Sequence, residues 1–364
     1  MKRFSVRLLL APVFLSGALM LSACPSAVCC DLPPEPILKQ ELLTNFADAV
    51  AVPTYERLAT RLDALDAAAR ALRSEPTEAR LAAARQAWLA AREPWARSEA
   101  FLFGPADSDG HASALDSWPV DRAALDGVFA NDGVLTAESV RGLPATQRGF
   151  HAVEYVLFGE DGARAAESLT PRELEYLTLV TEEMKSVGAA LTGAWTQTTA
   201  GQPPYRDTLA GTGLSADAIE PAVRVSAKRM VDGVIDLLDE VATAKLTAPY
   251  EAKDPSLLEN QFARASVSDL VENLRGVESV YLGHAADVAV QGQTLRDVVG
   301  FGTDVDARVR GELTQALQAL EKLPEPFPEA LGAPASADEI EAARDAVRKV
   351  HGTFQRDVLP RVIP

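Results

Sequence analysis

The 364-residue chain has an ordinary globular composition, with 47% hydrophobic residues, 24% charged residues, 23 Gly and 23 Pro. These shares exclude wholesale disorder and a collagen-like repeat. Its 35 Lys and Arg oppose 52 Asp and Glu, which gives a formal charge of −17, so nucleic acid is not an expected partner. An acidic chain instead supplies oxygen ligands for hard cations. The length suits two domains or one large one.

Residues 1–23 have the pattern of a bacterial lipoprotein signal peptide. Three basic residues precede an apolar run over positions 8–20, which is shorter than the roughly 20 residues that span a bilayer. The run ends in Leu21-Ser22-Ala23-Cys24, which resembles a lipobox, and this motif implies cleavage before Cys24 and lipid modification of that residue. We therefore expect a lipid-anchored protein of the bacterial cell envelope. Pro25, in place of an Asp after the cysteine, favours the outer membrane, with the protein facing the periplasm or the cell surface.

Residues 24–36, with the sequence CPSAVCCDLPPEP, form a Pro-rich stretch. This composition predicts an extended tether between the anchor and the folded part. Cys29 and Cys30 are the remaining cysteines, and in an exported protein they can pair with each other under strain or with another chain. No cysteine follows them in the sequence, so a cysteine nucleophile or a cysteine zinc ligand is excluded downstream.

Apolar residues recur at spacings of three and four along the rest of the chain, which is typical of amphipathic helices. Between Ile37 and Leu102 the stripe includes Leu58, Leu62 and Leu65. The same spacing of apolar residues predicts further helices over Pro171–Trp195, Ala216–Leu246, Pro255–Asp287, Val305–Leu323 and Ala337–Leu359. Thr170 and Ser336 are in the positions of helix N-caps. Because each helix has one apolar stripe to bury, we predict an all-α fold of helical bundles.

A polar, breaker-rich stretch at 198–204 divides the mature chain into near-equal halves. We predict an N-terminal bundle over residues 37–200 and a C-terminal bundle over residues 201–364. The pattern V-E-x-V-x-x-G occurs at 153–159 and again at 277–283. This echo is weak support for a pseudo-repeat of two related bundles.

Three of the four histidines have ordinary structural interpretations. His351 lies on a C-terminal amphipathic helix, where surface packing is expected. His111 follows an acidic turn that lacks the third acidic position and the final Glu of a calcium loop. His284 precedes Asp287 by three residues, a spacing that suits either a metal site or, by chance, a solvated polar face.

His151 and Glu154 differ because they share one face of an otherwise apolar helix over residues 149–159. An imidazole and a carboxylate one turn apart can hold one cation, and bundle-core di-metal proteins use the reversed order Glu-x-x-His. Without a metal, a buried ionised Glu154 needs a cationic partner. Arg92 or Arg148 could supply that charge, which leaves a purely structural His–Glu–Arg cluster as the alternative.

Further ligands for a metal would have to come from elsewhere in the chain. Arg92, Trp95 and Glu99 share a helical face if Pro94 bends the helix rather than ending it. We predict Glu99 and Asp116 as the additional ligands. An inverzincin protease would need His where Tyr155 stands, so two ligands from this motif do not define a protease.

The sequence G-F-H-A-V-E-Y resembles the G-x-H-x-x-E signature of the imelysin family. Other segments resemble the family in the same order along the chain, namely Arg92-Glu93-Pro94-Trp95, residues 98–105, Leu115-Asp116-Ser117-Trp118-Pro119, Leu157-Phe158-Gly159 and residues 274–283. The resemblance implies two helical bundles, an envelope location, a site near the domain interface and a role in acquiring iron or another metal. The resemblance places His151 and Glu154 in the signature motif. It places Glu99, Asp116, Trp118 and Arg92 in the companion segments, and Tyr281 lies in the segment at residues 274–283.

These observations favour a protein that binds iron, zinc or an iron-bearing ligand at a cleft between two bundles. The expected partners are the metal ion or metal-bearing ligand, the membrane through the lipid anchor, and a surface receptor or transporter. The alternative is a zinc-dependent metallopeptidase, because the family carries a peptidase label. The motif lacks the third protein ligand that hydrolytic zinc sites usually show, so binding is favoured. A third interpretation is an adaptor whose His–Glu pair only stabilises the bundle.

Overall fold

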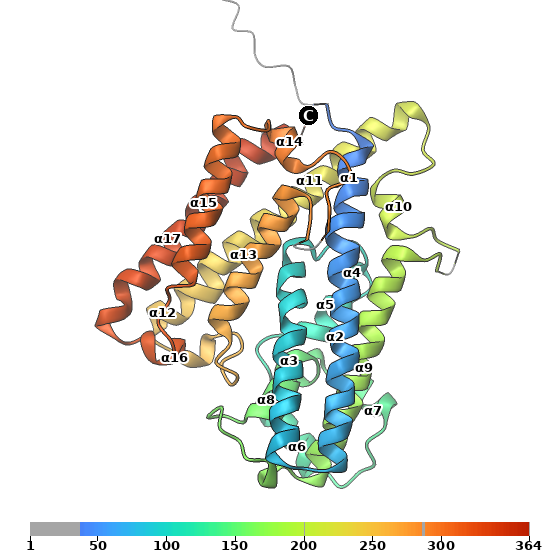
Figure 1. Cartoon of the computed structure of the whole chain (residues 1–364). Helices are drawn as coiled ribbons and strands as arrows, with labels where there is room; N and C mark the ends of the chain where they lie inside the picture. Colours follow the sequence, from blue (N-terminus) through green and yellow to red (C-terminus); the bar gives the residue numbers. More distant parts are fainter. Residues whose placement is uncertain (1–36, 200, 286–287, 364) are drawn as a thin grey trace, which may run out of the picture. The chain divides into compact units, whose positions relative to one another are not determined.

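The computed structural model of the chain describes residues 37–199, 201–285 and 288–363 (Figure 1). The predicted signal peptide, tether and lipidation site, with Cys24, Cys29 and Cys30, lie outside these residues. The all-α fold class is confirmed, since the described residues contain no strand and only one isolated bridge, between Thr199 and Gln202. None of the described helices is both long and apolar enough to cross a membrane.

The first half is built on three long helices. Helix α2 packs against both α3 and α9, and Figure 1 shows the three running side by side. Shorter helices cover their ends. The helices of this half are α1 (Gln40–Phe46), α2 (Val52–Ser74), α3 (Glu78–Ser98), α4 (Pro105–Ser108), α5 (His111–Asp116), α6 (Arg122–Ala130), α7 (Ala137–Arg141), α8 (Phe150–Phe158) and α9 (Pro171–Thr196).

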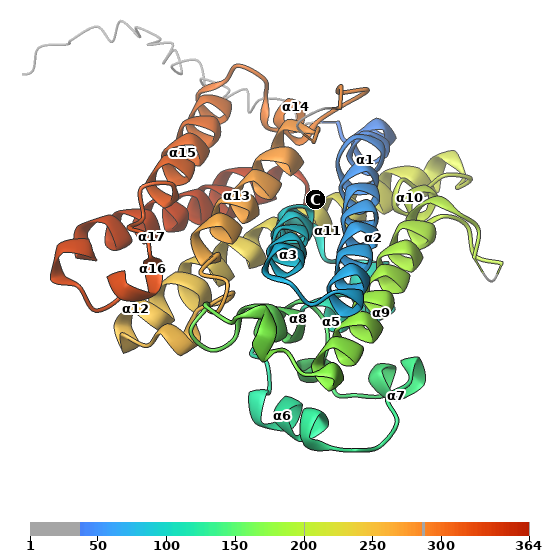
Figure 2. The same cartoon turned by 60° about the horizontal axis from the view of Figure 1, so that its bottom comes forward.

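The second half pairs α11 with α13 and α17, and α15 with α13 and α17. Figure 2 shows these helices from another side. Its helices are α10 (Tyr205–Leu209), α11 (Ala216–Glu240), α12 (Ala248–Ala252), α13 (Ser266–Leu282), α14 (Leu295–Val299), α15 (Asp304–Leu320), α16 (Phe327–Ala330) and α17 (Ala337–Thr353). Short 3₁₀ turns cover Glu99–Phe101, Ala145–Gln147, Ala166–Ser168, Pro255–Leu257, Pro334–Ser336 and Leu359–Arg361.

Three π-helical turns interrupt or extend the long helices, at Ala47–Ala51, Val241–Thr247 and Phe354–Val358. Each turn is followed, at the second residue after its end, by a proline: Pro53, Pro249 and Pro360. A proline inside a helix cannot donate a hydrogen bond and its ring crowds the carbonyl four residues earlier. A widened turn just before the proline relieves that crowding, so the chain continues as an α-helix at Pro53 and Pro249 and as the 3₁₀ turn Leu359–Arg361 at Pro360.

Of the two predicted N-cap residues, one caps its helix in the structure and the other does not. At Thr170 the capping box is confirmed, because its hydroxyl accepts from Glu173 N and the Glu173 side chain accepts from Thr170 N. The predicted cap at Ser336 is wrong, since its side chain makes no capping hydrogen bond. Ser336 already ends a 3₁₀ turn, with φ −97° and ψ −4°, rather than having the extended backbone of an N-cap.

The predicted helix Pro255–Asp287 begins eleven residues late, at Ser266. Asn260 and Arg264 both have φ +55°, a conformation that a continuing right-handed helix cannot include. The segment before Ser266 is therefore a folded loop. This difference matters because the loop carries residues of the candidate site.

Helix α3 of the first half and α13 of the second half make close contact. A Cβ atom on Gly276 would lie 2.2 Å from the carbonyl oxygen of Arg97, so only glycine permits this approach. Pro94 lies within α3 and does not end it. The described residues all belong to one compact unit, and the division into domains near residue 200 stays a prediction.

Candidate metal centre

The signature glycine positions the signature histidine. Gly149 precedes α8 with φ +81°, and a Cβ atom there would lie 2.3 Å from the carbonyl oxygen of Leu115. Only glycine can adopt this conformation at such close range. The contact holds the start of α8 against the end of α5, where Asp116 is the last helical residue. His151 and Asp116 are thereby brought together.

Three side chains converge on one point. His151 Nε2 lies 3.0 Å from Asp116 Oδ1 and 3.7 Å from Glu259 Oε1. One ligand atom from each of the three residues lies within 4.8 Å of the other two, which is close enough for all three to hold a single ion. One imidazole and two carboxylates are a donor set that suits iron, zinc or manganese.

Glu154 lies on the other side of the imidazole ring. Its Oε2 is 3.4 Å from His151 Nδ1, whereas its Oε1 accepts a 2.8 Å hydrogen bond from Ala263 N. The structure thus places this predicted ligand where it orients the ring. A carboxylate bonded to the remote nitrogen fixes the tautomer and directs Nε2 to the metal.

Arg92, on α3, is the central cation of the cluster and is 1% exposed. It donates to Asp116 at 2.5 Å, to Glu259 at 2.8 Å and to Asp269. The Asp116 carboxylate also accepts from Trp95 Nε1 at 2.5 Å. Arg92 therefore fixes the ligand carboxylates in place.

Neither arginine that the sequence offered as a partner for Glu154 pairs with it. Arg92 is engaged by the carboxylates described above, and Arg148 pairs with Glu183 on α9 at 2.5 Å. Both oxygens of Glu154 already have partners in His151 and the Ala263 amide. The predicted His–Glu–Arg cluster is wrong in this respect.

Glu99 lies beside the centre and is not one of the three converging residues. Its Oε2 pairs with the ammonium group of Lys245, which also lies 2.9 Å from Glu259 Oε2 and donates to Asn273 Oδ1 at 3.3 Å. Lys245 comes from the π-helical turn that follows α11. Burial raises the pKa of Glu99 to about 8, against the opposing effect of Lys245.

The cluster contains more negative than positive groups. It contains two basic side chains, those of Arg92 and Lys245, and five carboxyl groups. The carboxyl groups belong to Glu99, Asp116, Glu154, Glu259 and Asp269. Burial disfavours a charged ring, but Asp116 outweighs it and, with Glu154, raises the pKa of His151 to about 10. A protonated imidazole then supplies positive charge that a metal ion would otherwise supply.

A further observation indicates that these donor atoms suit a metal ion. His151 Nε2 is buried and, among the described residues, has no partner in hydrogen-bond geometry, although Asp116 Oδ1 is only 3.0 Å away. A buried polar nitrogen without a hydrogen bond is costly. A metal ion between this nitrogen and the carboxylates of Asp116 and Glu259 would satisfy it.

A cavity of about 410 Å³ adjoins the centre. Its lining includes Asp116 and Glu259, together with Glu99, Lys245 and Trp118. Trp118, which the sequence offered as a site candidate, lines this cavity. The cavity therefore reaches Asp116 and Glu259, whereas His151 is not part of its lining.

Tyr281 is separate from the centre. Its hydroxyl donates to Asp306 at 3.1 Å, and Asp306 also accepts from Arg296 at 2.8 Å. This second buried cluster ties α13 to α14 and α15. Tyr281 therefore supports the second half of the fold rather than the metal ligands.

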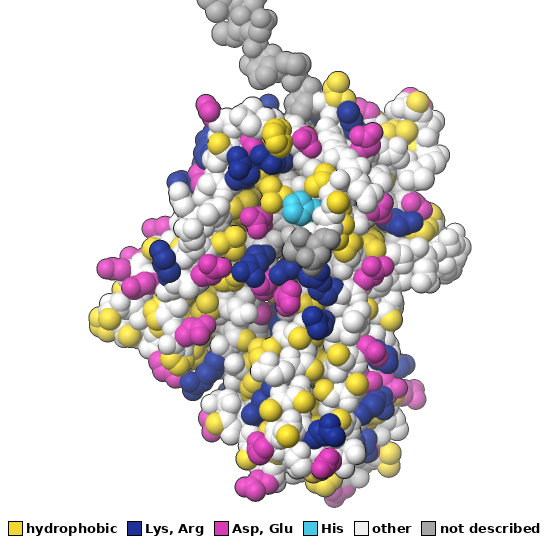
Figure 3. All heavy atoms as spheres, viewed as in Figure 1, with side chains coloured by type: hydrophobic (Ala, Val, Ile, Leu, Met, Phe, Trp, Pro, Cys, Tyr) yellow, Lys and Arg dark blue, Asp and Glu magenta, His cyan; other side chains and the backbone are white. Residues whose placement is uncertain are grey.

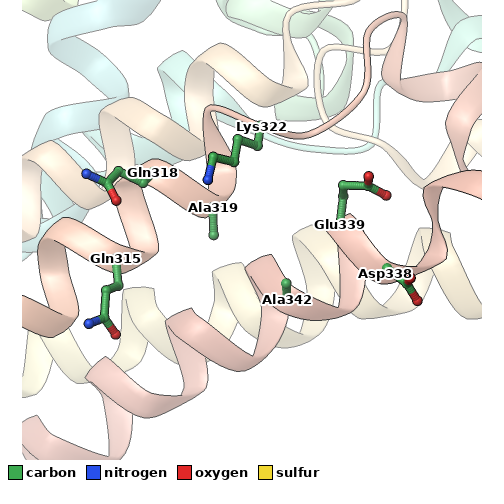
Figure 4. A pocket seen from close by; sticks show the side chains of 7 residues that line it. All are labelled: Gln315, Gln318, Ala319, Lys322, Asp338, Glu339 and Ala342. Carbon is green, nitrogen blue, oxygen red and sulfur yellow. The ribbon is translucent and has the colours of Figure 1, made fainter.

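One other hollow and the remaining histidines are separate from the three converging side chains of the metal centre. A hollow of about 380 Å³ lies between parts of the packed helices α15 and α17 (Figure 4), and its lining includes no histidine. His111 and His351 are partly exposed, the former 4.0 Å from Asp109. The predicted pairing of His284 involves Asp287, which lies outside the described residues. On the face seen in Figure 3, acidic and basic side chains are interspersed.

The sequence did not indicate Glu259, Lys245 or Asp269. Glu259 was hidden by the incorrect helix prediction, which made it one acidic residue among many on a surface. For Asp269 a signal existed: Asp269, Glu272, Asn273 and Gly276 recur at the spacing of a buried helical face. All four positions face α3 in contacts with Arg92, Arg97 or Ala96.

Comparison with known proteins shows the family of this chain. The family model described as Imelysin matches residues 51–354. The chain belongs to the imelysin family. It is 33% identical over 328 residues to iron-regulated protein A of Synechococcus elongatus, covering 89% of this chain and 88% of that protein.

Two solved structures share the fold. One, described as an iron-regulated protein A precursor from Parabacteroides distasonis, has a TM-score of 0.77 and 26% identity, covering 88% of this chain and 94% of that chain. An imelysin-like protein from Psychrobacter arcticum has a TM-score of 0.69 at 17% identity, with the same coverage. The match to the second shows the fold alone.

Proposed function

We propose that this imelysin-family protein binds a metal ion, iron first, through Asp116, His151 and Glu259, and serves metal uptake. The observation that carries the proposal is the convergence of the buried His151 Nε2 with the carboxylates of Asp116 and Glu259, at 3.0 Å and 3.7 Å, without a well-oriented hydrogen bond to this nitrogen among the described residues. A relative named iron-regulated protein A supports iron over other metals. Zinc suits the same donors.

The ion would be held by one nitrogen and carboxylate oxygens, with Glu154 orienting the imidazole and Arg92 fixing the carboxylates. Three protein ligands leave coordination positions open, because iron commonly takes up to six ligands and zinc four or five. Water or the oxygen atoms of a small chelating ligand can fill them from the 410 Å³ cavity. A bound metal-bearing ligand is therefore compatible with the same site.

The charge of the cluster also favours a cation. In the metal-free protein Arg92, Lys245 and a protonated His151 face the five carboxyl groups, and a divalent or trivalent ion that displaces the imidazole proton brings more positive charge than it removes. Unbalanced buried charge is costly, and a metal ion at this position would lower that cost. Metal binding should therefore stabilise the folded protein.

We also propose that the protein works at the cell envelope through a lipid on Cys24. The support is the sequence of residues 1–24, in which basic residues, an apolar run and the Leu-Ser-Ala-Cys motif occur in the required order. Such an anchor would hold a metal-binding domain near a membrane transporter or surface receptor. Several acyl chains are needed for stable attachment.

Calorimetric titration of the chelator-treated protein with Fe²⁺ under anaerobic conditions, and with Zn²⁺, tests the site. We expect one tightly bound ion per chain in the wild type and in the control His351→Ala, whose histidine lies on α17. His151→Ala should lose this binding. A melting curve for each variant without metal separates lost binding from lost folding. Equal binding by a folded His151→Ala protein would refute the site.

A further inference from the structure

Three exposed apolar side chains lie on two neighbouring segments of the chain. Ile37 is 77% exposed, Phe301 is 67% exposed and Val290 is 44% exposed. Isolated apolar residues are common on protein surfaces, whereas apolar residues gathered at one place mark an interaction surface. We call these three residues the apolar end.

The two segments are the start of the described chain and the loops that flank α14. The Gln293 side chain joins them, since it donates to Ile37 O at 3.0 Å and accepts from Lys39 N at 2.9 Å. Val290 lies three residues before Gln293, and Phe301 is the second residue after α14. Figure 1 shows α14 and the start of α1 at the same end of the molecule. The three apolar residues therefore belong to one region of the surface.

Phe301 lies at the tip of a fixed turn. It stands between Gly300 and Gly302, whose φ angles are +110° and +76°. Gly302 N donates to the buried carboxylate of Asp306 at 3.0 Å, and the Arg296 guanidinium carbon lies 4.0 Å from the centre of the Phe301 ring. These contacts hold the turn, and the ring with it, at the surface. An aromatic ring buries about 150–250 Å² in a core or an interface, so a ring held at an exposed tip indicates contact with another apolar surface.

The sequence supplies an apolar phase close to this end. The predicted lipid is on Cys24, thirteen residues before Ile37, and a chain of that length spans at most about 45 Å. Along the chain, the bilayer is thus tied to the apolar end more closely than to any other described part. A membrane surface is therefore the partner that the apolar end meets most often.

We propose that the apolar end rests on the phospholipid surface that holds Cys24, with the Phe301 ring inserted at the boundary between headgroups and acyl chains. This inference rests on the lipid anchor of the proposed function. Membrane binding grows with the apolar area that is buried, so three side chains bind weakly by themselves. The anchor keeps the apolar end at a high effective concentration beside the bilayer, and weak contacts then suffice to orient the protein on it.

Charged side chains at this end do not select a lipid. Lys39 is exposed, and so are Glu41, Asp297 and Asp304. Acidic groups therefore offset the basic ones, and the attraction to anionic headgroups that polybasic segments provide is not the source of the contact. The contact should form on zwitterionic phosphatidylcholine.

The test is the quenching, by brominated lipids, of a fluorescent label on the apolar end. The full-length lipidated protein, with Cys29→Ser and Cys30→Ser, is inserted in phosphatidylcholine vesicles that carry bromine near the top of the acyl chains. A single label is attached through Phe301→Cys or Val290→Cys. The matched control is Val134→Cys, because Val134 is 86% exposed in the loop between α6 and α7, which Figure 1 shows at the other end of the molecule.

We expect bromine to quench the labels at positions 301 and 290 several-fold more than the label at position 134. A further Phe301→Ser change should reduce quenching of the label at position 290, because the inserted ring holds this end on the bilayer. Equal quenching at the three positions would overturn the inference. Labels at 301 and 290 that neither bromine nor dissolved iodide quenches would also overturn it, because a second copy of the chain would then cover the apolar end.

Mass spectrometry of the same protein separates this inference from the proposed anchor. If Cys24 carries lipid and the three labels are quenched equally, only the proposed orientation fails. If Cys24 carries no lipid, the proposed anchor fails and this inference fails with it. Metal titration of the same variants reports on the centre independently, since none of the changed residues lines the cavity beside it.

Discussion

Replacing Gly276 with alanine should destabilise the protein, although alanine is the better helix former. The new Cβ would lie 2.2 Å from Arg97 O and 3.0 Å from Arg97 Cα. These are backbone atoms that no side-chain rotation can move away, so α13 and α3 must separate. Overpacking a core costs about 1–3 kcal/mol, and a backbone partner places this case at the upper end. The higher helix propensity of alanine offsets up to about 1 kcal/mol of this cost.

We therefore expect Gly276→Ala to lower the free energy of unfolding by about 2 kcal/mol. Gly311 is the matched control, because it also lies inside a helix, α15, and its added Cβ would meet nothing within 4 Å. Gly311→Ala should raise the free energy of unfolding by about 0.5–1 kcal/mol. The two alanine variants thus have effects of opposite sign.

Urea denaturation measures both effects, through a shift in midpoint at constant slope. Metal affinity gives a second readout, because α3 carries Arg92 and α13 carries its partner Asp269. Separating the helices should weaken binding in Gly276→Ala and leave Gly311→Ala at the wild-type value. A Gly276→Ala protein as stable as Gly311→Ala would refute the inference that backbone contact sets the distance between α3 and α13.

Three further perturbations test other parts of the structure. Lys245→Met removes the ammonium group that Glu99 and Glu259 share and leaves Arg92 as their cationic partner, so the metal-free protein should lose about 3 kcal/mol of stability, measured by urea denaturation. Burial raises the pKa of Asp306, but the hydrogen bond from Arg296 outweighs burial and lowers this pKa to about 2. The ionised Asp306 therefore stabilises the folded protein fully above about pH 4, and this stabilisation is lost as the pH falls toward 2. In acid titrations Asp306→Asn should therefore show a smaller loss of stability over that interval, and an unchanged loss would contradict this. Finally, Cys24→Ser should move the protein from the membrane to the soluble fraction of fractionated bacterial cells, and unchanged membrane attachment would refute the lipid anchor.

The sequence was sufficient for features that depend on local spacing. The three- and four-residue periodicity predicted α9 and α17 close to their observed starts, because each helix buries one stripe against its neighbours. The spacing of His151 and Glu154 likewise placed both side chains near one buried point. Such inferences need only helical geometry, which is fixed within one element.

Features that depend on irregular backbone could not be predicted in this way. Glu259 reaches the centre from a loop whose turns need φ +55° at Asn260 and Arg264, and neither residue type signals this conformation by itself. Lys245 lies in a π-helical turn, which shifts the helical register by a fraction of a turn relative to an ideal helix. The role of Glu154 depended on the Ala263 amide, more than a hundred residues away.

The central claim is that Asp116, His151 and Glu259 hold one metal ion. Anomalous X-ray scattering at the iron absorption edge, from crystals of the protein loaded with Fe²⁺ without oxygen, tests this most directly. We expect one strong peak at about 2.0–2.2 Å from His151 Nε2, the usual length of a metal–imidazole bond, and in contact with the Asp116 and Glu259 carboxylates. A peak elsewhere, or a fully occupied iron that leaves His151 uncoordinated, would contradict the account.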